Sequence, residues 1–314
     1  MTTHSPIFFD ANNTTTFVKL TKSESPDAKA PFSVSKFVDL SQLEQRLRVQ
    51  AICFENNSIA FFSKSVVLVE GTSDALVLPH LARLVHDGKG FERGNVALCR
   101  IDGKGSIARY RAFFSSFDVQ VLVIADLDCI LDGFDKLGPS QKTNALRREL
   151  LTILDDELAQ HTASPPSGSQ LREHAKKTTT RERWEELQRL FTAAGTTPEE
   201  LKQAGDAFFN ENQFNGRRAL LESSTSVSIQ GKKRELLREL RLNGIFILER
   251  GAIEAYYPEA VTGSDKVSKA LAFTTQVTSK AQALSLCGTV PSDSGEGPEF
   301  EVIFRELFAL TDQT

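Results

Sequence analysis

Four short runs of mostly apolar residues stand out along the chain and predict the strands of a buried sheet. Each run is rich in aliphatic, often β-branched residues and is too short for a helix. The predicted strands are Val66–Val69, Asn95–Ile101, Val121–Ala125 and Ile245–Leu248.

Helical patterns separate the first three runs. The first helix is expected to begin at Ser73 or Asp74, both common N-cap residues, and to continue to His86. The second follows Ser106 and continues to Phe117. Strands that alternate with helices in this way predict an α/β fold with a parallel sheet.

The alternation stops after Asp128. A charged amphipathic helix is predicted over Thr143–Glu157, and a linker rich in Ser, Pro and Gly follows at His161–Ser169. Further helical segments are predicted at Thr180–Ala194, Thr197–Asn210 and Gly216–Ser223. This part of the chain therefore predicts an all-α domain inserted into the sheet domain.

The segments at the two ends carry weaker patterns. An edge strand is expected at Thr16–Leu20 and a helix at Leu40–Ala51. The later part predicts helices over Gly231–Arg241, Lys266–Ala272 and Phe300–Leu310, with an acidic, glycine-rich loop at Ser292–Pro298.

Bulk composition is that of an ordinary globular protein, with 40% hydrophobic and 25% charged residues among 314. No apolar run approaches the roughly 18 residues of a membrane span, and no signal peptide opens the chain. We expect a soluble, cytoplasmic protein that contacts no membrane. The cysteines form no zinc spacing and are expected to pack as apolar residues; they are Cys53, Cys99, Cys129 and Cys287.

The net charge of −4 argues against a protein that coats DNA. It does not exclude a nuclease, because metal-binding acids count as negative until the cation arrives. Basic residues in the helical insert, interleaved with Trp184 and Phe214, form either a solvated helix face or a DNA contact; they are Arg147, Arg148, Lys176, Lys177, Arg181, Arg183, Arg217 and Arg218.

Acidic residues directly follow two of the predicted strands. Glu70 follows the first, and Asp126 and Asp128 follow the third, where strand alternation places both on one face. Ligands of open α/β sheets bind at this carboxyl edge. Carboxylates so close together require a cation, and their oxygens suit Mg²⁺ or Mn²⁺. Either pattern alone is usually a turn or a cap, but the pair is far more specific.

A glycine-flanked lysine, Lys104, follows the second predicted strand and enters a helix. Such a turn can hold a phosphate. It lacks the upstream glycine of a P-loop, so we interpret it either as a contact to a DNA phosphate or as a plain turn.

The strand–Glu70-Gly71–helix unit and the later Asp126-x-Asp128 together resemble the Toprim fold of topoisomerases, primases, RecR-type repair proteins and OLD nucleases. The sequence of Phe61–Ser65, followed by VVLVEGTSDALVLP, is most similar to the OLD (overcoming lysogenisation defect) family. The segment after Leu248, with Arg-Gly, Ile-Glu and Tyr-Tyr pairs, resembles the closing part of such a domain. The implied fold is a Toprim-type, Rossmann-like parallel sheet with an inserted helical domain.

The resemblance also implies domain boundaries. Residues 1–63 would connect to a preceding ATPase domain, because Thr3-His4-Ser5-Pro6 resembles the switch-histidine segment of RecF-, SMC- and ABC-type ATPases. Such a domain is expected in the full-length protein, while this sequence holds no Walker A loop and no nucleotide site. The remaining parts are the Toprim core at 64–142, the helical insert at 143–230 and the closing Toprim segment at 231–314.

Carried over from the family, the reaction would be hydrolysis of DNA phosphodiesters with two divalent ions. Glu70 and Asp74 would bind one ion, and Asp126 and Asp128 the other, with Asp126 or Asp128 as a bridge. Glu254 would either reach a metal or hold a basic residue. A catalytic lysine is placed by position at Lys232 or Lys233, with Lys104 as the next candidate.

These residues lead to the hypothesis of a metal-dependent DNA endonuclease and nickase, with or without exonuclease activity. A non-catalytic, RecR-like DNA-binding scaffold and an RNA-processing Toprim nuclease stay open as alternatives. A topoisomerase is disfavoured because it needs a tyrosine on a DNA-gating domain, whereas Tyr110, Tyr256 and Tyr257 lie within Toprim elements.

Overall fold

A computed structural model of the chain describes residues 16–23, 32–39, 41, 60–86, 88, 90–92, 94–101, 103–161, 184–185, 188–193, 197–198, 201, 216–292 and 295–312. They divide into two compact units, Met1–Thr143 with Leu236–Thr314, and Asn144–Glu235. The predictions for the Thr-His-Ser-Pro segment, the helices at Leu40–Ala51 and Thr197–Asn210, and the linker lie wholly or largely outside the described residues. Of the helix predicted at Thr180–Ala194, residues 184–185 and 188–192 are described and helical.

A four-stranded parallel sheet forms the centre of the first unit. Its strands are β3 (Ser65–Val69), β4 (Val96–Arg100), β5 (Gln120–Ala125) and β6 (Ile245–Ile247), in the order β4-β3-β5-β6. Val66 lies opposite both Ala97 and Val121 in this register. The predicted strands and the α/β fold are therefore confirmed.

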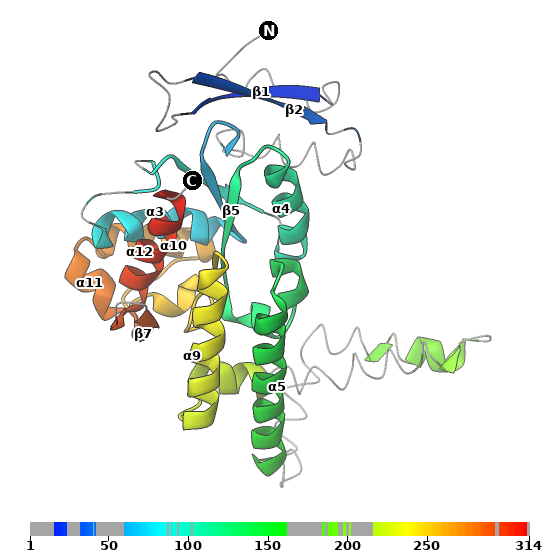
Figure 1. The fold of residues 1–314 in the computed structure, drawn as a ribbon. Coiled ribbons are helices and arrows are strands. Elements are labelled where there is room, and N and C mark those ends of the chain that lie inside the picture. Colours follow the sequence, from blue (N-terminus) through cyan, green and yellow to red (C-terminus); the bar gives the residue numbers. More distant parts are fainter. Residues whose placement is uncertain are drawn as a thin grey trace. The chain divides into compact units, whose positions relative to one another are not determined.

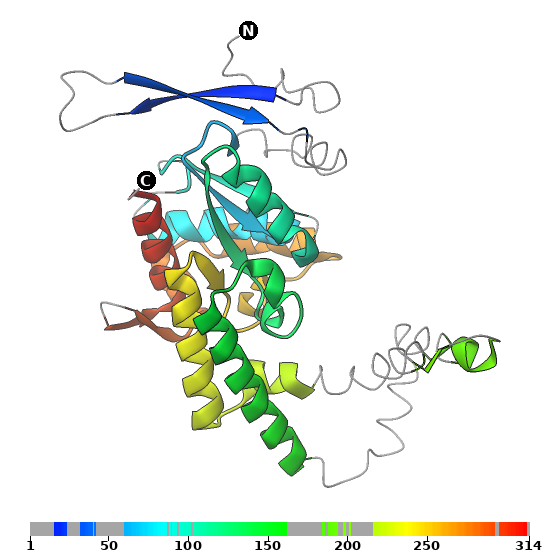
Figure 2. The same cartoon turned by 45° about the vertical axis from the view of Figure 1, so that its right-hand side comes forward.

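Helices cover both faces of this sheet, which explains why its strands are apolar at nearly every position (Figures 1 and 2). On one face lie α3 (Thr72–Val85), α10 (Lys266–Gln276), α11 (Lys280–Ser285) and α12 (Glu299–Asp312). On the other lies α4 (Ile107–Ser115).

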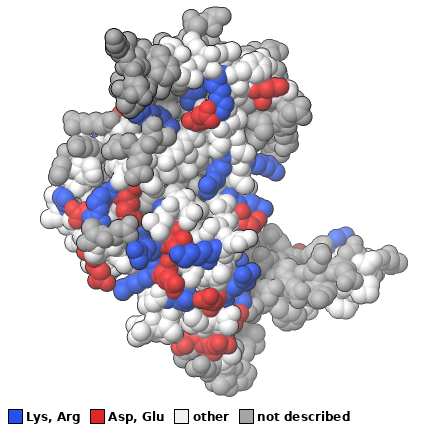
Figure 3. All heavy atoms as spheres, viewed as in Figure 1, with Lys and Arg blue, Asp and Glu red and all other residues white. Residues whose placement is uncertain are grey.

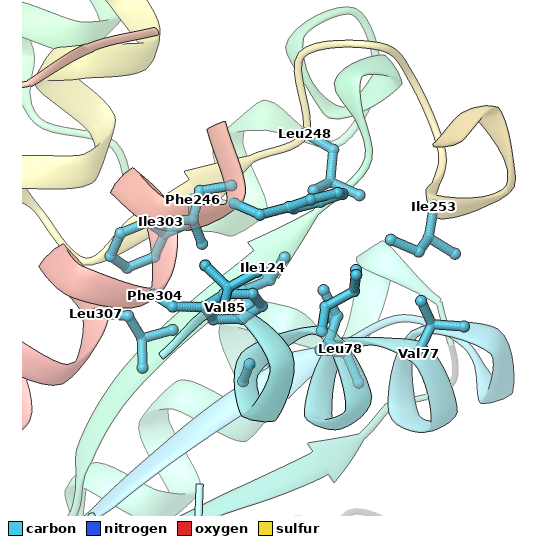
Figure 4. Packing of buried hydrophobic residues seen from close by; sticks show 14 of the residues in the cluster. Val77, Leu78, Val85, Ile124, Phe246, Leu248, Ile253, Ile303, Phe304 and Leu307 are labelled. Atoms are coloured by element: carbon cyan, nitrogen blue, oxygen red, sulfur yellow. The ribbon is translucent and has the colours of Figure 1, made fainter. Parts of the chain in front are cut away.

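The core between the sheet and α12 is shown in Figure 4, where Val85 of α3 and Ile124 of β5 lie beside Phe304 of α12. Phe304 and Leu307 are fully buried, and their spacing places them on one face of α12. Replacing a buried phenylalanine such as Phe304 with alanine is expected to cost about 3–5 kcal/mol. The closing segment of the chain is thus part of the same core as the strands near residue 70.

The predicted start of α3 was wrong. The helix begins at Thr72 with Gly71 as its N-cap, so Asp74 lies in the first turn. The backbone N–H of Gly71 donates to Asp74 Oδ2 at 2.9 Å. An acid three residues after the N-cap can satisfy this free N–H, as in a capping box, and also favours the helix dipole.

The acidic loop predicted at Ser292–Pro298 was also wrong. The strands β7 (Thr289–Ser292) and β8 (Gly295–Pro298) form an antiparallel hairpin there. Gly295 has a φ of 112°, a conformation that favours glycine. Of the two glycines that suggested a loop, Gly295 begins β8 directly after the turn and Gly297 pairs with Val290 within the hairpin.

A second antiparallel pair, β1 (Thr16–Ser23) and β2 (Phe32–Asp39), precedes the sheet in sequence. Its presence confirms the predicted strand at Thr16–Leu20. Val38 is buried, whereas Val18 and Phe37 pair on the opposite face and are exposed.

The second unit is helical in its described residues. It contains most of α5 (Gln141–His161), a helix at 216–223 and the first part of α9 (Val227–Leu242). Leu146, Leu150 and Leu154 are buried at helical spacing, as the amphipathic pattern predicted. The Arg217 guanidinium binds both oxygens of Asp155, at 2.7 and 2.6 Å. In the part of the chain that the structure describes, no helix has the length and apolar character needed to cross a membrane.

Candidate metal centre

The carboxyl ends of all four parallel strands meet at one edge of the sheet. Glu70 directly follows β3, Lys104 follows β4 and Asp126 directly follows β5. The chain leaves β3 toward β4 on one side, and β5 lies on the other, so this edge is a topological switch point. Such a point is where α/β sheets bind ligands.

Acidic side chains gather at this edge, and we call them the acidic cluster: Glu70, Asp74, Asp126, Asp128 and Glu254. A pocket of about 350 Å³ is lined by four of them, Glu70, Asp74, Asp126 and Glu254, together with Gly71, Thr72, Ser73, Gly103, Lys266 and Val267. Glu254 enters from the 3-10 helix η5 (Ile253–Tyr256), which follows β6. The structure thus brings together acids separated by more than a hundred residues of sequence.

Asp126 and Asp128 reach the cluster by a different route from the one predicted. Strand β5 ends at Ala125, and the chain then forms the 3-10 helix η3 (Leu127–Ile130). Asp126 is the N-cap of this helix and Asp128 lies within it. Strand alternation therefore does not explain their placement, although both acids lie in the acidic cluster.

The Cys129 thiol is part of the site. Its Sγ donates to Glu70 Oε1 at 3.2 Å, and ligand atoms of Glu70, Asp128 and Cys129 all lie within 4.8 Å of one another. Burial and the neighbouring charge of Glu70 raise the pKa of the Cys129 thiol, so it stays protonated. The residue is buried, as expected for packing, and it also orients a candidate metal ligand.

The carboxyl groups of the acidic cluster are close together and partly buried, so their ionised forms are unfavourable when no cation is bound. Burial, reinforced by Asp74, Glu70 and the other acids, raises the pKa of Asp126 to about 8. Burial also raises the pKa of Asp74 to about 6, against the opposing effect of the Gly71 N–H. The pKa of Glu70 is raised for the same reason. These carboxyl groups would release protons when a cation binds.

Two described lysines form ion pairs with the cluster. Lys104 Nζ lies 3.1 Å from Asp128 Oδ2 and 3.2 Å from Asp132 Oδ2. Lys266 Nζ lies 3.3 Å from Glu254 Oε1. Glu254 therefore lines the pocket and also holds a basic residue. Sequence reasoning missed Asp132 and Lys266, because neither belongs to a recognisable pattern.

Lys232 and Lys233 lie in the second unit, whereas the acidic cluster belongs to the first. Lys232 Nζ donates to Glu149 at 2.8 Å and to Glu235 at 2.7 Å. Lys233 is buried and donates to the carbonyl of Leu221 at 2.9 Å. A catalytic role for either lysine stays a prediction.

The donor set fits hard divalent cations. All members of the acidic cluster offer carboxylate oxygens, which Mg²⁺ and Mn²⁺ prefer. The raised pKa values of Asp74 and Asp126 indicate charge that a bound cation would neutralise. Among the described residues, Glu70 and Asp128 present carboxylate oxygens close enough together to share one ion, with Cys129 beside them.

Comparisons with known proteins agree with this geometry. Residues 61–128 match the TOPRIM domain of the overcoming lysogenization defect protein-like family. The chain is 22% identical over 166 residues to the Old nuclease of Escherichia phage P2; this region makes up 52% of the chain and 28% of the phage protein. No solved structure matches. The predicted resemblance is confirmed: residues 61–128, which span β3 to the Asp126-x-Asp128 turn, match the OLD-like Toprim domain.

Proposed function

We propose that this protein is a divalent-metal-dependent DNA nuclease that nicks or cuts DNA by hydrolysing phosphodiester bonds. The observation that carries the proposal is the acidic cluster at the carboxyl edge of an OLD-like Toprim sheet. Similarity to a phage protein named Old nuclease supports the same reaction class.

Each acid has a role in this proposal. Glu70 and Asp74 hold one ion, and Asp126 and Asp128 hold the other, with Asp126 or Asp128 as the bridge. When bound, the ions would supply an activated water and stabilise the leaving oxygen. Glu254, from the 3-10 helix that follows β6, completes the ligand set.

Hydrogen bonds prepare two of these ligands before any cation arrives. Asp74 Oδ2 accepts the Gly71 N–H, and Glu70 Oε1 accepts the Cys129 thiol. Ligands oriented by neighbouring groups lose less conformational entropy on binding, which strengthens metal affinity. The protein thus contributes orientation and a partly buried site.

DNA contacts would be local rather than spread over a basic surface. On the face drawn in Figure 3, basic side chains are interspersed with acidic ones, in line with a net charge of −4. Lys232 or Lys233 remains our candidate, from its position in the sequence, for the cation that stabilises the transition state.

Nicking of supercoiled plasmid tests the proposal. The protein should nick DNA in Mg²⁺ or Mn²⁺ without ATP, and EDTA should abolish nicking; Asp126→Asn is the matched control for a contaminating nuclease. Nicking that survives EDTA would contradict the metal-dependent mechanism.

RNA of the same sequence, incubated side by side with DNA, separates the substrate classes. Cleavage of RNA alone would assign the RNA-processing alternative. Metal and DNA binding without cleavage of either would assign the scaffold alternative.

A further inference from the structure

We propose that Lys104 is a phosphate-binding residue of this site. Its ammonium forms ion pairs with Asp128 and Asp132 until a divalent cation displaces it from Asp128. Its ammonium would then bind a non-bridging oxygen of the nucleic-acid backbone. The inference rests on the proposed nuclease function, because it names a residue that contacts the substrate of that site.

The backbone places Lys104 next to Gly103, a residue that lines the pocket. Lys104 begins the 3-10 helix η2 (Lys104–Ser106), a few residues after the end of β4, the strand beside β3. Gly103, with a φ of 72°, makes the preceding turn and lines the same pocket as the acids. Burial raises the pKa of Glu70, and a hydrogen bond from the backbone of Lys104 opposes this rise. Lys104 is therefore tied to the site by its main chain as well as its side chain.

The side chain of Lys104 packs against the backbone of Gly133. A Cβ atom added to Gly133 would lie 3.1 Å from Lys104 Cδ and 3.2 Å from its Cγ. Gly133 has a φ of 85°, so glycine is favoured there on both counts. The bare backbone leaves a path for the lysine stem toward Asp128.

The charged end of Lys104 remains within reach of solvent. Its side chain is 21% exposed, and that of its partner Asp132 is 67% exposed. An ammonium has three N–H donors, so it can turn from a carboxylate to a phosphate oxygen without a change of backbone. A lysine presented this way suits a substrate contact better than a buried structural ion pair.

Lysine and metal compete for Asp128 in this arrangement. Lys104 Nζ bonds to Oδ2 of Asp128, the residue that we assign to the second ion. Removing the lysine should therefore tighten metal binding while it weakens DNA binding. A lysine that only supports the fold would weaken both together, and these opposite signs identify the role.

The decisive variant is Lys104→Met in the full chain, with Lys136→Met as its control. Lys136 pairs with Asp135 at 2.6 Å on the neighbouring 3-10 helix η4 (Phe134–Leu137), outside the acidic cluster. Calorimetric titration of the DNA-free protein with Mn²⁺ should show roughly two- to fivefold tighter binding in Lys104→Met, the effect of losing a partly exposed ion pair. Lys136→Met should bind Mn²⁺ like wild type.

DNA affinity is then measured in Ca²⁺ against salt concentration. Lys104→Met should reduce the slope of log affinity against log salt by about one, the loss of one phosphate contact, and Lys104→Arg should restore it. Nicking by Lys104→Met in Mn²⁺ should fall by about 100-fold or more.

Asp132→Asn offers a second test if Lys104→Met does not fold. Asp132 is exposed, and its loss should free Lys104 and strengthen DNA binding in a variant that keeps Lys104. An unchanged salt slope in Lys104→Met, an unchanged DNA affinity in Asp132→Asn, or wild-type nicking by Lys104→Met would overturn the role of Lys104 alone. If wild type nicks nothing, the nuclease proposal fails, while the Mn²⁺ titration and the salt slope still decide whether Lys104 binds phosphate.

Discussion

The hydroxyl of Tyr256 donates to the carboxylate of Glu299 inside the core, at 2.8 Å from each oxygen. Glu299 also accepts the backbone N–H of Glu249 at 2.7 Å. Tyr256 ends the 3-10 helix that carries Glu254, and Glu299 is the first residue of α12. The start of the last helix thus fixes the loop that brings Glu254 to the metal centre.

Tyr256→Phe should remove the hydrogen bond between the Tyr256 hydroxyl and Glu299 without creating a large cavity. The buried Glu299 carboxylate loses a donor, so we expect the free energy of unfolding to fall by about 1–3 kcal/mol. Mn²⁺ affinity should also fall, because Glu254 is less well positioned. Urea unfolding and Mn²⁺ calorimetry measure the two effects. The control is Tyr110→Phe, a buried tyrosine on α4, which should leave Mn²⁺ affinity unchanged.

Asp126→Asn tests the acidic cluster directly. Without metal the variant should melt at a higher temperature than wild type, since a buried, mutually repelling carboxylate is gone. Nicking should fall at least about 100-fold, because even partners of metal ligands cost 10–100-fold in affinity. Melting in EDTA and in Mn²⁺, beside plasmid nicking, measures both. A variant that melts early but nicks at the wild-type rate would show a packing role instead; exposed Asp135→Asn is the control.

Stability of the metal-free protein should fall as pH rises from about 4 to about 8. The pKa of Asp74 is about 6 and that of Asp126 about 8, both above the ordinary value of 3.8. The folded protein therefore holds these protons more tightly than the unfolded chain, and losing them destabilises it. Saturating Mn²⁺ should reduce the fall, because metal binds the deprotonated form. Melting temperatures at several pH values, in EDTA and in Mn²⁺, check this, and a flat profile in EDTA would contradict it.

Lys233→Met separates a structural from a catalytic role. The buried ammonium satisfies the Leu221 carbonyl near the end of the helix at 216–223, so its loss should cost about 1–3 kcal/mol of unfolding free energy. If Lys233 also stabilises the transition state, nicking per folded molecule should fall by about 10²–10³-fold. Lys232→Met, measured in parallel, tests the other candidate. Wild-type nicking by both folded variants would exclude the pair.

The sequence alone was sufficient for the sheet and for the identity of several site residues. Val66–Val69 and Val121–Ala125 are short apolar runs, and burial on both faces requires that pattern. Glu70 and Asp126 directly follow these strands, so parallel pairing was enough to bring them to one edge. These features depend on residue patterns that are local in sequence and on a general rule of sheet topology.

The tertiary structure alone decided how the remaining groups meet. Three contacts join segments far apart in the chain. The side chain of Lys104 passes over Gly133 to Asp128, and the Cys129 thiol donates to Glu70. The hydrogen bond between Tyr256 and Glu299 supports the segment that carries Glu254. No local periodicity encodes such contacts, because they depend on how loops of irregular geometry pack against one another. The 3-10 turn at Asp128 also has a partner far away in the chain, because the backbone N–H of Leu127 donates to the carbonyl of Gly251 at 3.2 Å.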